Sequence, residues 1–435
     1  MNKIPQLFLI IFLITIYGCK NETPKPKQPP LSPNYKITIV KGDNQADTLN
    51  HLLKDTVIVK VTNNGNPYLK GTIRFIVSGC DSDETTDFNT LVGGLAYYNW
   101  RLNSTAGKQY LKAVLLDSLN KKVDSVTLTA NAAAPQHGWQ PVGCIPPSLY
   151  NIATLAKLSS GRLLTGFYQN GYPYYSDDNA LTWHPLKSFG NTHSVRKIIT
   201  TPADEIFILT YSEGIFYSPD AGKTWQLRNG NAPFSEPLDL VYTQSGKLFF
   251  NVGGALYLST DKGVNFNFAG GGTYNYINIG EQPNGTDYAI NNQRLISNTS
   301  GSVWNEVNSA FDFNHYMQSL FIDDNGDIYI GTEYVTAQIY RSKDNGSTWN
   351  SVYTEKAANG LEFAITQMQK QNGYYSFYVA DQGLVKTKDF TTYTNIKNPF
   401  MTGPLDGDWS TYVFANNNAL VIGGNEINGI YYYLP

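Results

Sequence analysis

The sequence is short of charge and of helical periodicity. Only 15% of its 435 residues are charged and the formal net charge is −3, so it lacks the basic surface that nucleic-acid binding requires. No long stretch repeats its apolar residues at the 3.6-residue spacing of an amphipathic helix. Aromatic residues reach 14%, in short Tyr-rich runs broken by Gly, Asn and Asp, which is typical of strands and tight turns. The composition predicts an all-β protein with two folded domains.

Cysteine and histidine are also scarce. The three cysteines are Cys19, Cys80 and Cys144, and none belongs to a CxxC pair or has metal-ligand spacing. A disulfide is chemically allowed in an exported protein, but spacing alone does not tell whether Cys80 and Cys144 pair, and we interpret them as two unlinked thiols. The five histidines form no HxxH or HExxH pattern. The sequence therefore predicts no metal site and no cofactor.

The N-terminal sequence is typical of a targeting segment. Residues 7–17 (LFLIIFLITIY) form an apolar run of signal-peptide length, and Gly18-Cys19 at its end resembles a bacterial lipobox. We predict a lipoprotein signal peptide over residues 1–18 and a lipid anchor on Cys19, in the outer membrane of a bacterium. A plain secretory signal with an incidental cysteine, or an N-terminal membrane helix, are the alternatives. Residues 19–34 are polar and Pro-rich, which indicates an extended tether.

Residues 35–132 predict a β-sandwich. Strand-like runs separated by Gly, Asn and Asp lie at residues 35–40, 56–62, 71–77, 96–102, 110–116 and 123–130. The pattern resembles bacterial immunoglobulin-like domains of invasin-type adhesins, through residues such as Gly71-Thr72-Ile73-Arg74-Phe75 and Trp100-Arg101-Leu102. Trp100 is the expected core aromatic. The resemblance implies a spacer or adhesion module.

Residues 134–435 contain a repeated motif. Its successive copies, the last of them worn, begin 42, 41, 38, 45 and 45 residues apart, which is the length of a four-stranded propeller blade. One copy starts at Ser297, and the worn copy starts at Thr387. The better-preserved copies contain Ser176, Asp178 and Trp183; Ser218, Asp220, Gly222 and Trp225; Ser259, Asp261 and Gly263; and Ser342, Asp344, Gly346 and Trp349.

These copies resemble the Asp-box, S-x-D-x-G-x-T-W, of BNR-repeat, sialidase-like β-propellers. Asp accepts backbone hydrogen bonds within its own turn, and Gly allows positive φ. The resemblance implies that each box joins the third and fourth strands of a blade, on the face away from the usual active site. We therefore interpret the box residues as structural, since turn hydrogen bonds occupy their carboxylates.

The blade count follows from the two ends of the domain. Six boxes define six blades, and residues 410–435 supply three further strands. Residues 138–142 (GWQPV) look like the strands that follow the boxes, so they are expected to complete a seventh blade and close the ring. We predict seven blades, with six as the alternative.

The Asp-box resemblance raises two kinds of glycosidase chemistry as candidate functions. A sialidase needs three arginines around a carboxylate, and the propeller region has only Arg162, Arg196, Arg228, Arg294 and Arg341, none in an Arg-Ile-Pro motif. The sequence therefore argues against sialidase activity. A glycoside hydrolase with two carboxylates stays open as the alternative function, because spacing does not give the separation of the carboxylates.

Binding without catalysis is the preferred function. The loops opposite the boxes are rich in aromatic, amide and acidic side chains, which suit a glycan or a protein partner. We predict a surface-exposed lipoprotein whose propeller binds such a ligand through this rim and does not bind nucleic acid. The candidate rim residues are Tyr172, Glu213, Glu333, Tyr334, Asp381, Trp409 and Glu426.

The predicted anchor is testable in cells. Since Cys19 is the one cysteine placed to be acylated at the end of the apolar run, Cys19→Ser should abolish labelling by a radioactive fatty acid and release the protein from the membrane fraction. Cys80→Ser is the matched control and should keep both properties. Equal labelling of the Cys19→Ser and Cys80→Ser variants would rule out the anchor.

Overall fold

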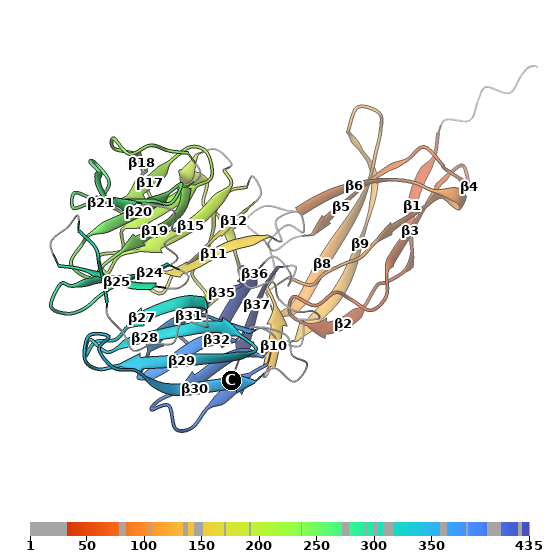
Figure 1. Cartoon of the computed structure of the whole chain (residues 1–435). Helices are drawn as coiled ribbons and strands as arrows, with labels where there is room; N and C mark the ends of the chain where they lie inside the picture. Colours follow the sequence, from red (N-terminus) through yellow and green to blue (C-terminus); the bar gives the residue numbers. More distant parts are fainter. Residues whose placement is uncertain are drawn as a thin grey trace, which may run out of the picture.

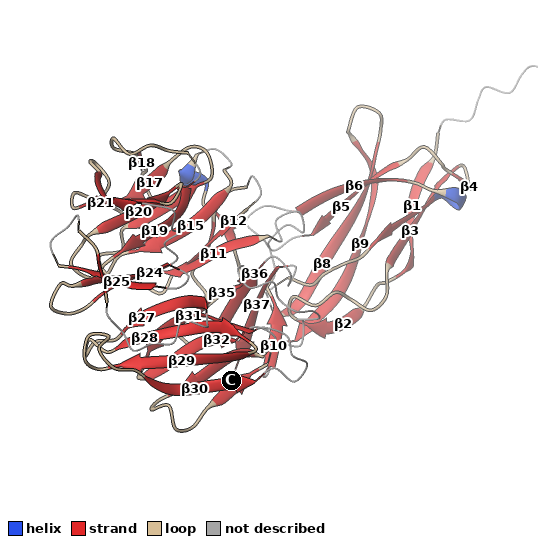
Figure 2. Cartoon of the chain, in the orientation of Figure 1, coloured by secondary structure: helices blue, strands red, loops and turns tan. Residues whose placement is uncertain are grey.

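The computed structural model describes residues 33–77, 84–103, 106–133, 138–142, 151–168, 171–190, 193–235, 237–271, 278–291, 294–299, 303–307, 316–356, 363–379, 382–397, 410–424 and 429–434. The three cysteines lie outside these ranges. The regular structure within them is almost entirely strand, with two short 3-10 helices, η1 (Val92–Gly94) and η3 (Lys187–Phe189) (Figure 2). This confirms the all-β class. No helix in the described ranges is long and apolar enough to cross a membrane.

The N-terminal part consists of two sheets (Figure 1). One contains β1 (Tyr35–Lys41), β3 (Val57–Asn63), β4 (Asn66–Pro67) and β7 (Leu95–Tyr98). The other has the order β2 (Gln45–Thr48), β9 (Lys122–Ala133), β8 (Gly107–Leu116), β5 (Thr72–Val77) and β6 (Glu84–Asn89). Alternating residues of β3 and β5 are buried, so each sheet turns one apolar face to a shared core.

Trp100 lies in that core and is fully buried, as the sequence predicted. The strands differ from the predicted ones in the length of one run and in number. The run predicted at 96–102 is a strand only as far as Tyr98, and Leu102 is buried outside any strand. Three strands were not predicted: the two-residue β4, β6, which has no alternating apolar residues, and β2, which pairs in parallel with β9. The predicted domain limits and the immunoglobulin-like assignment stay predictions.

The C-terminal part is a series of four-stranded antiparallel units. Each consists of consecutive strands, except the last, which takes one strand from the N-terminal side. The first four units are β11 (Ile152–Lys157), β12 (Leu163–Phe167), β13 (Tyr174–Ser176) and β14 (His184–Pro185); β15 (Val195–Thr200), β16 (Ile206–Thr210), β17 (Ile215–Ser218) and β18 (Gln226–Leu227); β19 (Pro237–Tyr242), β20 (Leu248–Val252), β21 (Ala255–Ser259) and β22 (Asn267–Gly271); and β23 (Asn278–Glu281), β24 (Asp287–Asn291), β25 (Arg294–Asn298) and β26 (Asn305–Glu306).

The remaining units complete the series. They are β27 (Tyr316–Ile322), β28 (Ile328–Tyr334), β29 (Thr336–Ser342) and β30 (Asn350–Lys356); β31 (Phe363–Gln371), β32 (Tyr374–Val379), β33 (Gly383–Thr387) and β34 (Thr394–Ile396); and β35 (Ser410–Phe414), β36 (Leu420–Gly424) and β37 (Gly429–Leu434) with β10 (Gly138–Pro141). A short pairing of β28 with β31 joins the fifth and sixth units into one eight-stranded sheet. The described strands thus group into seven four-stranded units, which favours the predicted count of seven blades.

The first strands of the units form the inside of the ring. β11 packs against both β15 and β35, and β31 packs against both β27 and β35. The second strands, such as β12, β16 and β20, are buried at every residue because neighbouring units cover both of their faces. This explains why they read as continuous apolar runs rather than as alternating ones.

The ends of the propeller meet in one sheet. β10 pairs antiparallel with β37, with Trp139 opposite Tyr433. The two rings pack with centroids 5.3 Å apart, and the Trp139 Nε1 donates a hydrogen bond of 2.7 Å to the Lys397 carbonyl oxygen. The predicted pairing of residues 138–142 with the C-terminal strands is confirmed. It covers an edge of β37 that would otherwise be exposed.

The antiparallel order of each unit defines two faces of the ring. Turns between first and second strands and between third and fourth strands share one face, here called the box face. Turns between second and third strands, and the connections between units, share the opposite face, here called the loop face. The Arg162 Nε, in a first-to-second turn, donates to Asp177 of a third-to-fourth turn at 2.7 Å, which places these two turns together.

Candidate functional site: the box turns and the loop face

The box turns are closed by one repeated set of hydrogen bonds. The Ser218 Oγ donates to the Asp220 Oδ1 at 2.8 Å and accepts from the Gly222 backbone N–H at 2.8 Å. Asp220 also accepts from the Thr224 backbone N–H at 2.8 Å and from the Thr224 hydroxyl at 2.7 Å. Gly222 has a φ of 88°, which glycine adopts without strain. Both carboxylate oxygens of Asp220 therefore accept hydrogen bonds within the turn.

The other copies repeat this arrangement with small changes. The Ser259–Asp261–Gly263 and Ser342–Asp344–Gly346 turns carry the same bonds, and Asn265 replaces the threonine in the first of them. The Ser176–Asp178 turn accepts its backbone hydrogen bond from Ala180, whose φ of 72° is one that glycine usually adopts. The worn copy at Thr387 keeps an Asp389–Thr391 contact of 2.7 Å.

The aromatic residue after each box packs between units. Trp183 and Phe266 are buried, with 1% of each side chain exposed, while Trp225 and Trp349 are half-buried. The Trp225 ring meets Phe189 edge-on at 5.0 Å, and η3 holds that phenylalanine in the connection to the second unit. The box side chains therefore make contacts within the fold, and none of the described boxes opens toward the loop face.

On the loop face, Glu213 lies beside a buried histidine. The His193 Nδ1 is 3.1 Å from the Glu213 Oε1, and His193 is held by a backbone bridge to Gly171 and by the Phe189 ring at 5.1 Å. Burial on its own would raise the pKa of the Glu213 carboxyl, but the polar groups of His193, Ser212 and Thr210 outweigh it, so the pKa lies below its usual range. Glu213 is therefore held as a carboxylate.

The other described rim residues lie on the fifth unit and the first. Tyr316 pairs with Glu333 across β27 and β28, and Tyr334 follows directly. Tyr316 is 49% exposed, Tyr334 41% and Val335 37%. We call Tyr316, Glu333, Tyr334 and Val335 the rim patch. Tyr172, by contrast, is half-buried and packs against the core between the first and last units.

The four predicted rim residues that the structure describes lie on three different units. Glu213 belongs to the second unit and Glu333 to the fifth, and the rim residues Asp381, Trp409 and Glu426 lie outside the described residues. The sequence did not single out Tyr316 and Val335. Val335 directly follows the predicted rim residue Tyr334 in the sequence, whereas Tyr316 comes next to Glu333 only through the pairing of β27 with β28. Exposure at a strand end is not visible in the sequence.

The five propeller arginines are all engaged locally. Their acceptors are Asp177 for Arg162, Asp327 for Arg341, Glu306 for Arg294, the Leu238 carbonyl oxygen for Arg196, and Gln226 for Arg228. They do not converge on one point, so the described residues hold no three-arginine carboxylate site. No group of three or more His, Cys, Asp and Glu with metal-binding geometry occurs among them either.

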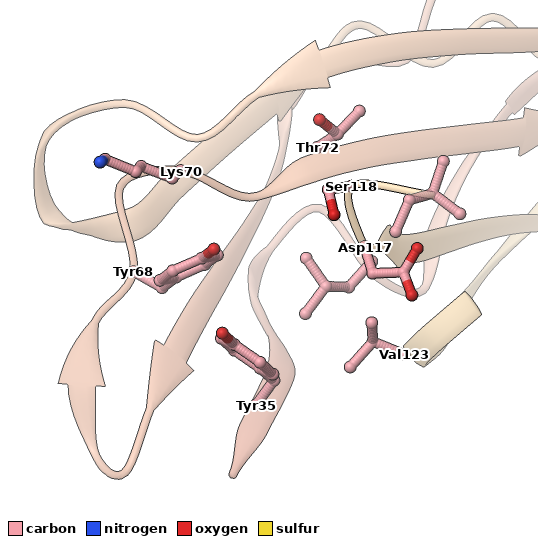
Figure 3. Close-up of a pocket in the computed structure, with 9 residues that line it drawn as sticks. Tyr35, Tyr68, Lys70, Thr72, Asp117, Ser118 and Val123 are labelled. Carbon is pink, nitrogen blue, oxygen red and sulfur yellow. The ribbon is translucent and has the colours of Figure 1, made fainter. Parts of the chain in front are cut away.

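A hollow of about 220 Å³ lies in the N-terminal sheets (Figure 3). Tyr35 and Tyr68 form one side, with ring centroids 4.9 Å apart. The Asp117 Oδ1 accepts from the backbone N–H groups of Leu119 and Lys121, so that oxygen holds the β8–β9 turn. Sequence reasoning missed this hollow because its residues come from four separated segments of the chain.

Comparison with known proteins gives a fold and no family. No family model matches the chain, and no curated protein matches it. Among solved structures, it is similar to YCF48 from Cyanidioschyzon merolae, at 14% identity and a TM-score of 0.51 over 68% of this chain and 99% of that one. It is also similar to the extracellular domain of the putative one-component system BT4673 from B. thetaiotaomicron, at 12% identity and a TM-score of 0.52 over 68% of this chain and 40% of that one.

A third similarity extends further along the chain. PorZ, a bacterial surface component of the type-IX secretion system of Porphyromonas gingivalis, is 12% identical with a TM-score of 0.50, over 89% of this chain and 68% of that one. At such identities these similarities show the fold alone. Together with the four-stranded units, they place the chain among the β-propeller proteins.

The box hydrogen bonds predict a pH dependence of stability. Bonds from Thr224 above all lower the pKa of the Asp220 carboxyl to about 2, and bonds from Asn265 do the same for Asp261. A carboxyl whose pKa is lowered by folding stabilises the folded state above its unfolded pKa, and that contribution is lost as the pH falls toward its folded pKa. The melting temperature should therefore drop between about pH 5 and about pH 2.

The double variant Asp220→Asn, Asp261→Asn isolates this contribution. At neutral pH the double variant should melt at a lower temperature than the unsubstituted protein. On acidification its melting temperature should fall by less, as followed by circular dichroism. Thr224→Val removes the hydroxyl donor of one box turn and keeps the backbone donor. Its drop in melting temperature on acidification should lie between those of the unsubstituted protein and the double variant. The same acid-induced loss in the unsubstituted protein and the double variant would show that these carboxylates do not hold the turns.

Proposed function

We propose that this chain is an exported lipoprotein anchored through Cys19, whose propeller binds a protein or glycan ligand on the loop face without catalysing a reaction. In this proposal the box turns are structural and the tether and N-terminal sheets hold the propeller away from the membrane. A protein ligand is the preferred class. Fold alone does not decide function, so the proposal depends on the site.

The observation that carries the proposal is the rim patch. Directly paired strand residues project on the same side of a sheet, so Tyr316 and Glu333 lie on one side of the β27–β28 ladder and Tyr334 on the other. Two tyrosines and a valine thus surround the loop-face end of this unit, each exposed by more than a third. Exposed aromatic groups next to polar ones are enriched where proteins bind partners.

The similar structures support this proposal in two ways. They include an extracellular domain and a bacterial surface component, which agrees with an exported protein. YCF48 has been solved bound to D1 peptide, so a propeller of this fold can hold a peptide. The signal-like segment 1–18 and the cysteine that follows it provide the independent argument for export.

The glycoside hydrolase alternative finds less support. A two-carboxylate mechanism needs a general acid with a raised pKa close to a second carboxylate. The pKa of Glu213 is lowered instead, and the other described rim carboxylate, Glu333, lies on a different unit beside the Gln318 amide. Glu213 therefore does not have the environment of a general acid.

A binding screen with a parallel hydrolysis assay tests the proposal. The purified chain without residues 1–19 is applied to a glycan array and a peptide array, and the strongest hit becomes the probe for affinity measurements. Replacing Tyr316 and Tyr334 by Ala should raise the Kd for that probe by about tenfold or more, because aromatic residues contribute strongly to binding hot spots. The melting temperature should hardly change, since both side chains are exposed.

Phe268→Ala is the matched control. Phe268 is 59% exposed but follows the box of the third unit, at the opposite end of its strand from the loop face. This variant should bind the probe as tightly as the unsubstituted protein. If the Phe268→Ala and the double tyrosine variants bind equally well, the rim patch is not the site. Release of reducing sugar from any arrayed glycan would instead establish the hydrolase.

A further inference from the structure

A second cavity lies inside the ring, on the side of the boxes. It has a volume of about 340 Å³ and is bordered by the ends of the first strands β11, β15, β31 and β35. The last three residues of β11, β15 and β31 line it, just before the turns that lead onto the box face. Its polar and charged lining residues are Lys157, Thr200, Gln369, Lys370, Gln371 and Tyr412.

Side-chain hydrogen bonds fix the walls of this cavity. The Thr200 hydroxyl donates to the Lys157 carbonyl oxygen at 2.9 Å, which ties β15 to β11. The Leu155 backbone N–H donates to the Thr411 hydroxyl at 3.2 Å, which ties β11 to β35. The cavity therefore exists before any ligand arrives, and a preformed site loses less entropy on binding.

A bulge in β31 shapes the remaining wall. The pairing of β31 with β32 shifts between Thr366 and Gln369, and Gln367 between them has a φ of 51°. Its carbonyl oxygen accepts the Tyr412 hydroxyl at 2.6 Å, so the bulge is locked to β35. Bulges redirect the side chains that follow them and often lie near functional sites. Here the residues that follow are Gln369, Lys370 and Gln371.

The two lysines of the cavity differ in their partners. The Lys370 Nζ lies 3.0 Å from the Asp324 Oδ2, so its charge is compensated. Lys157 is half-buried and has no acidic partner among the described residues, and burial alone lowers the pKa of its ammonium group. The carboxylate of Asp204, on the neighbouring box-face turn, accepts hydrogen bonds from the backbone N–H and the hydroxyl of Ser159 rather than from Lys157.

The other lysines of the inner strands and their first turns have acidic partners. Lys197 lies 2.5 Å from Asp239, and Lys247 lies within 3 Å of both Glu281 and Asp287. Lys157 is thus the described lysine that brings an uncompensated positive charge to the cavity. A partly desolvated ammonium group is stabilised by an anion that enters its surroundings.

We propose that this cavity is a binding site for a compact oxyanion, a small carboxylate or phosphate, held by the Lys157 ammonium with the amide groups of Gln369 and Gln371. Apolar residues of the inner strands, such as Ile198 and Val413, complete its lining. The cavity size admits an ion or a small organic acid. The site opens on the box side, so it does not depend on the ligand proposed for the loop face.

Calorimetry and thermal shift with three probes test the site. Inorganic phosphate, succinate and citrate are titrated into the full mature chain at low ionic strength, with glucose as the uncharged control. At least one anion should give saturable heat and raise the melting temperature, because a ligand of the folded state stabilises it. Saturable binding of none of the three anions would overturn the proposal.

Lys157→Met and Lys187→Met form the matched pair of variants. Lys187 is exposed at the start of η3, on the opposite face, so its replacement should leave the affinity unchanged. Lys157→Met should raise the Kd by about tenfold or more while melting, without anion, at least as high as the unsubstituted protein, since a desolvated charge is removed. Equal affinities of the two variants would contradict the proposal.

Proton uptake provides a readout that needs no variant. An anion beside Lys157 raises the pKa of its ammonium group. In a series of titrations from about pH 7 to about pH 11, binding should therefore take up protons wherever the free lysine is partly deprotonated, and the heat should then vary with the ionisation enthalpy of the buffer. Binding without proton uptake at every pH of the series would place the anion away from Lys157.

Discussion

The pairing of β10 with β37 is the interaction on which the rest of the propeller depends. Without it, the last unit would have three strands and an open edge, and the chain on the N-terminal side would have no fixed position beside the ring. With it, residues 138–141 and 429–434 lie in one sheet, and β11 packs against β35. The contact between β11 and β35 forms part of the wall of the inner cavity, so ring closure also shapes the proposed anion site.

Local patterns account for the parts of the fold that the sequence predicted. A box and its hydrogen bonds span only eight residues, from Ser218 to Trp225 for example, so their residue types reveal the turn directly. Closure was predictable because Trp139 and the residues after it look like the strands that follow boxes. Trp100 was identifiable as a core residue because a large aromatic in a small sandwich has few other places to pack.

Features that depend on distant segments were not predictable. The strand β2 pairs in parallel with β9, and nothing in its four residues indicates that partner. The cavity beside Lys157 combines residues from 155 to 413, and its shape depends on a bulge at Gln367 that no turn residue marks. The rim was only partly predictable, since Tyr172 packs inside while Tyr316, which was not singled out, is exposed. Loop composition indicates a face of the ring but not which side chains remain on its surface.

Ring closure can be measured directly by native-state hydrogen exchange of the chain without residues 1–19. In a closed ring, the amides of Gln140 and Tyr432, which face each other in the β10–β37 ladder, should be protected to a similar degree as those of β16 in the second unit, and should open with it in one cooperative step. Rapid exchange of the Gln140 amide beside slow exchange of β16 and β36 would contradict the account. It would show that the N-terminal strand only rests against the last unit and does not hold the propeller closed.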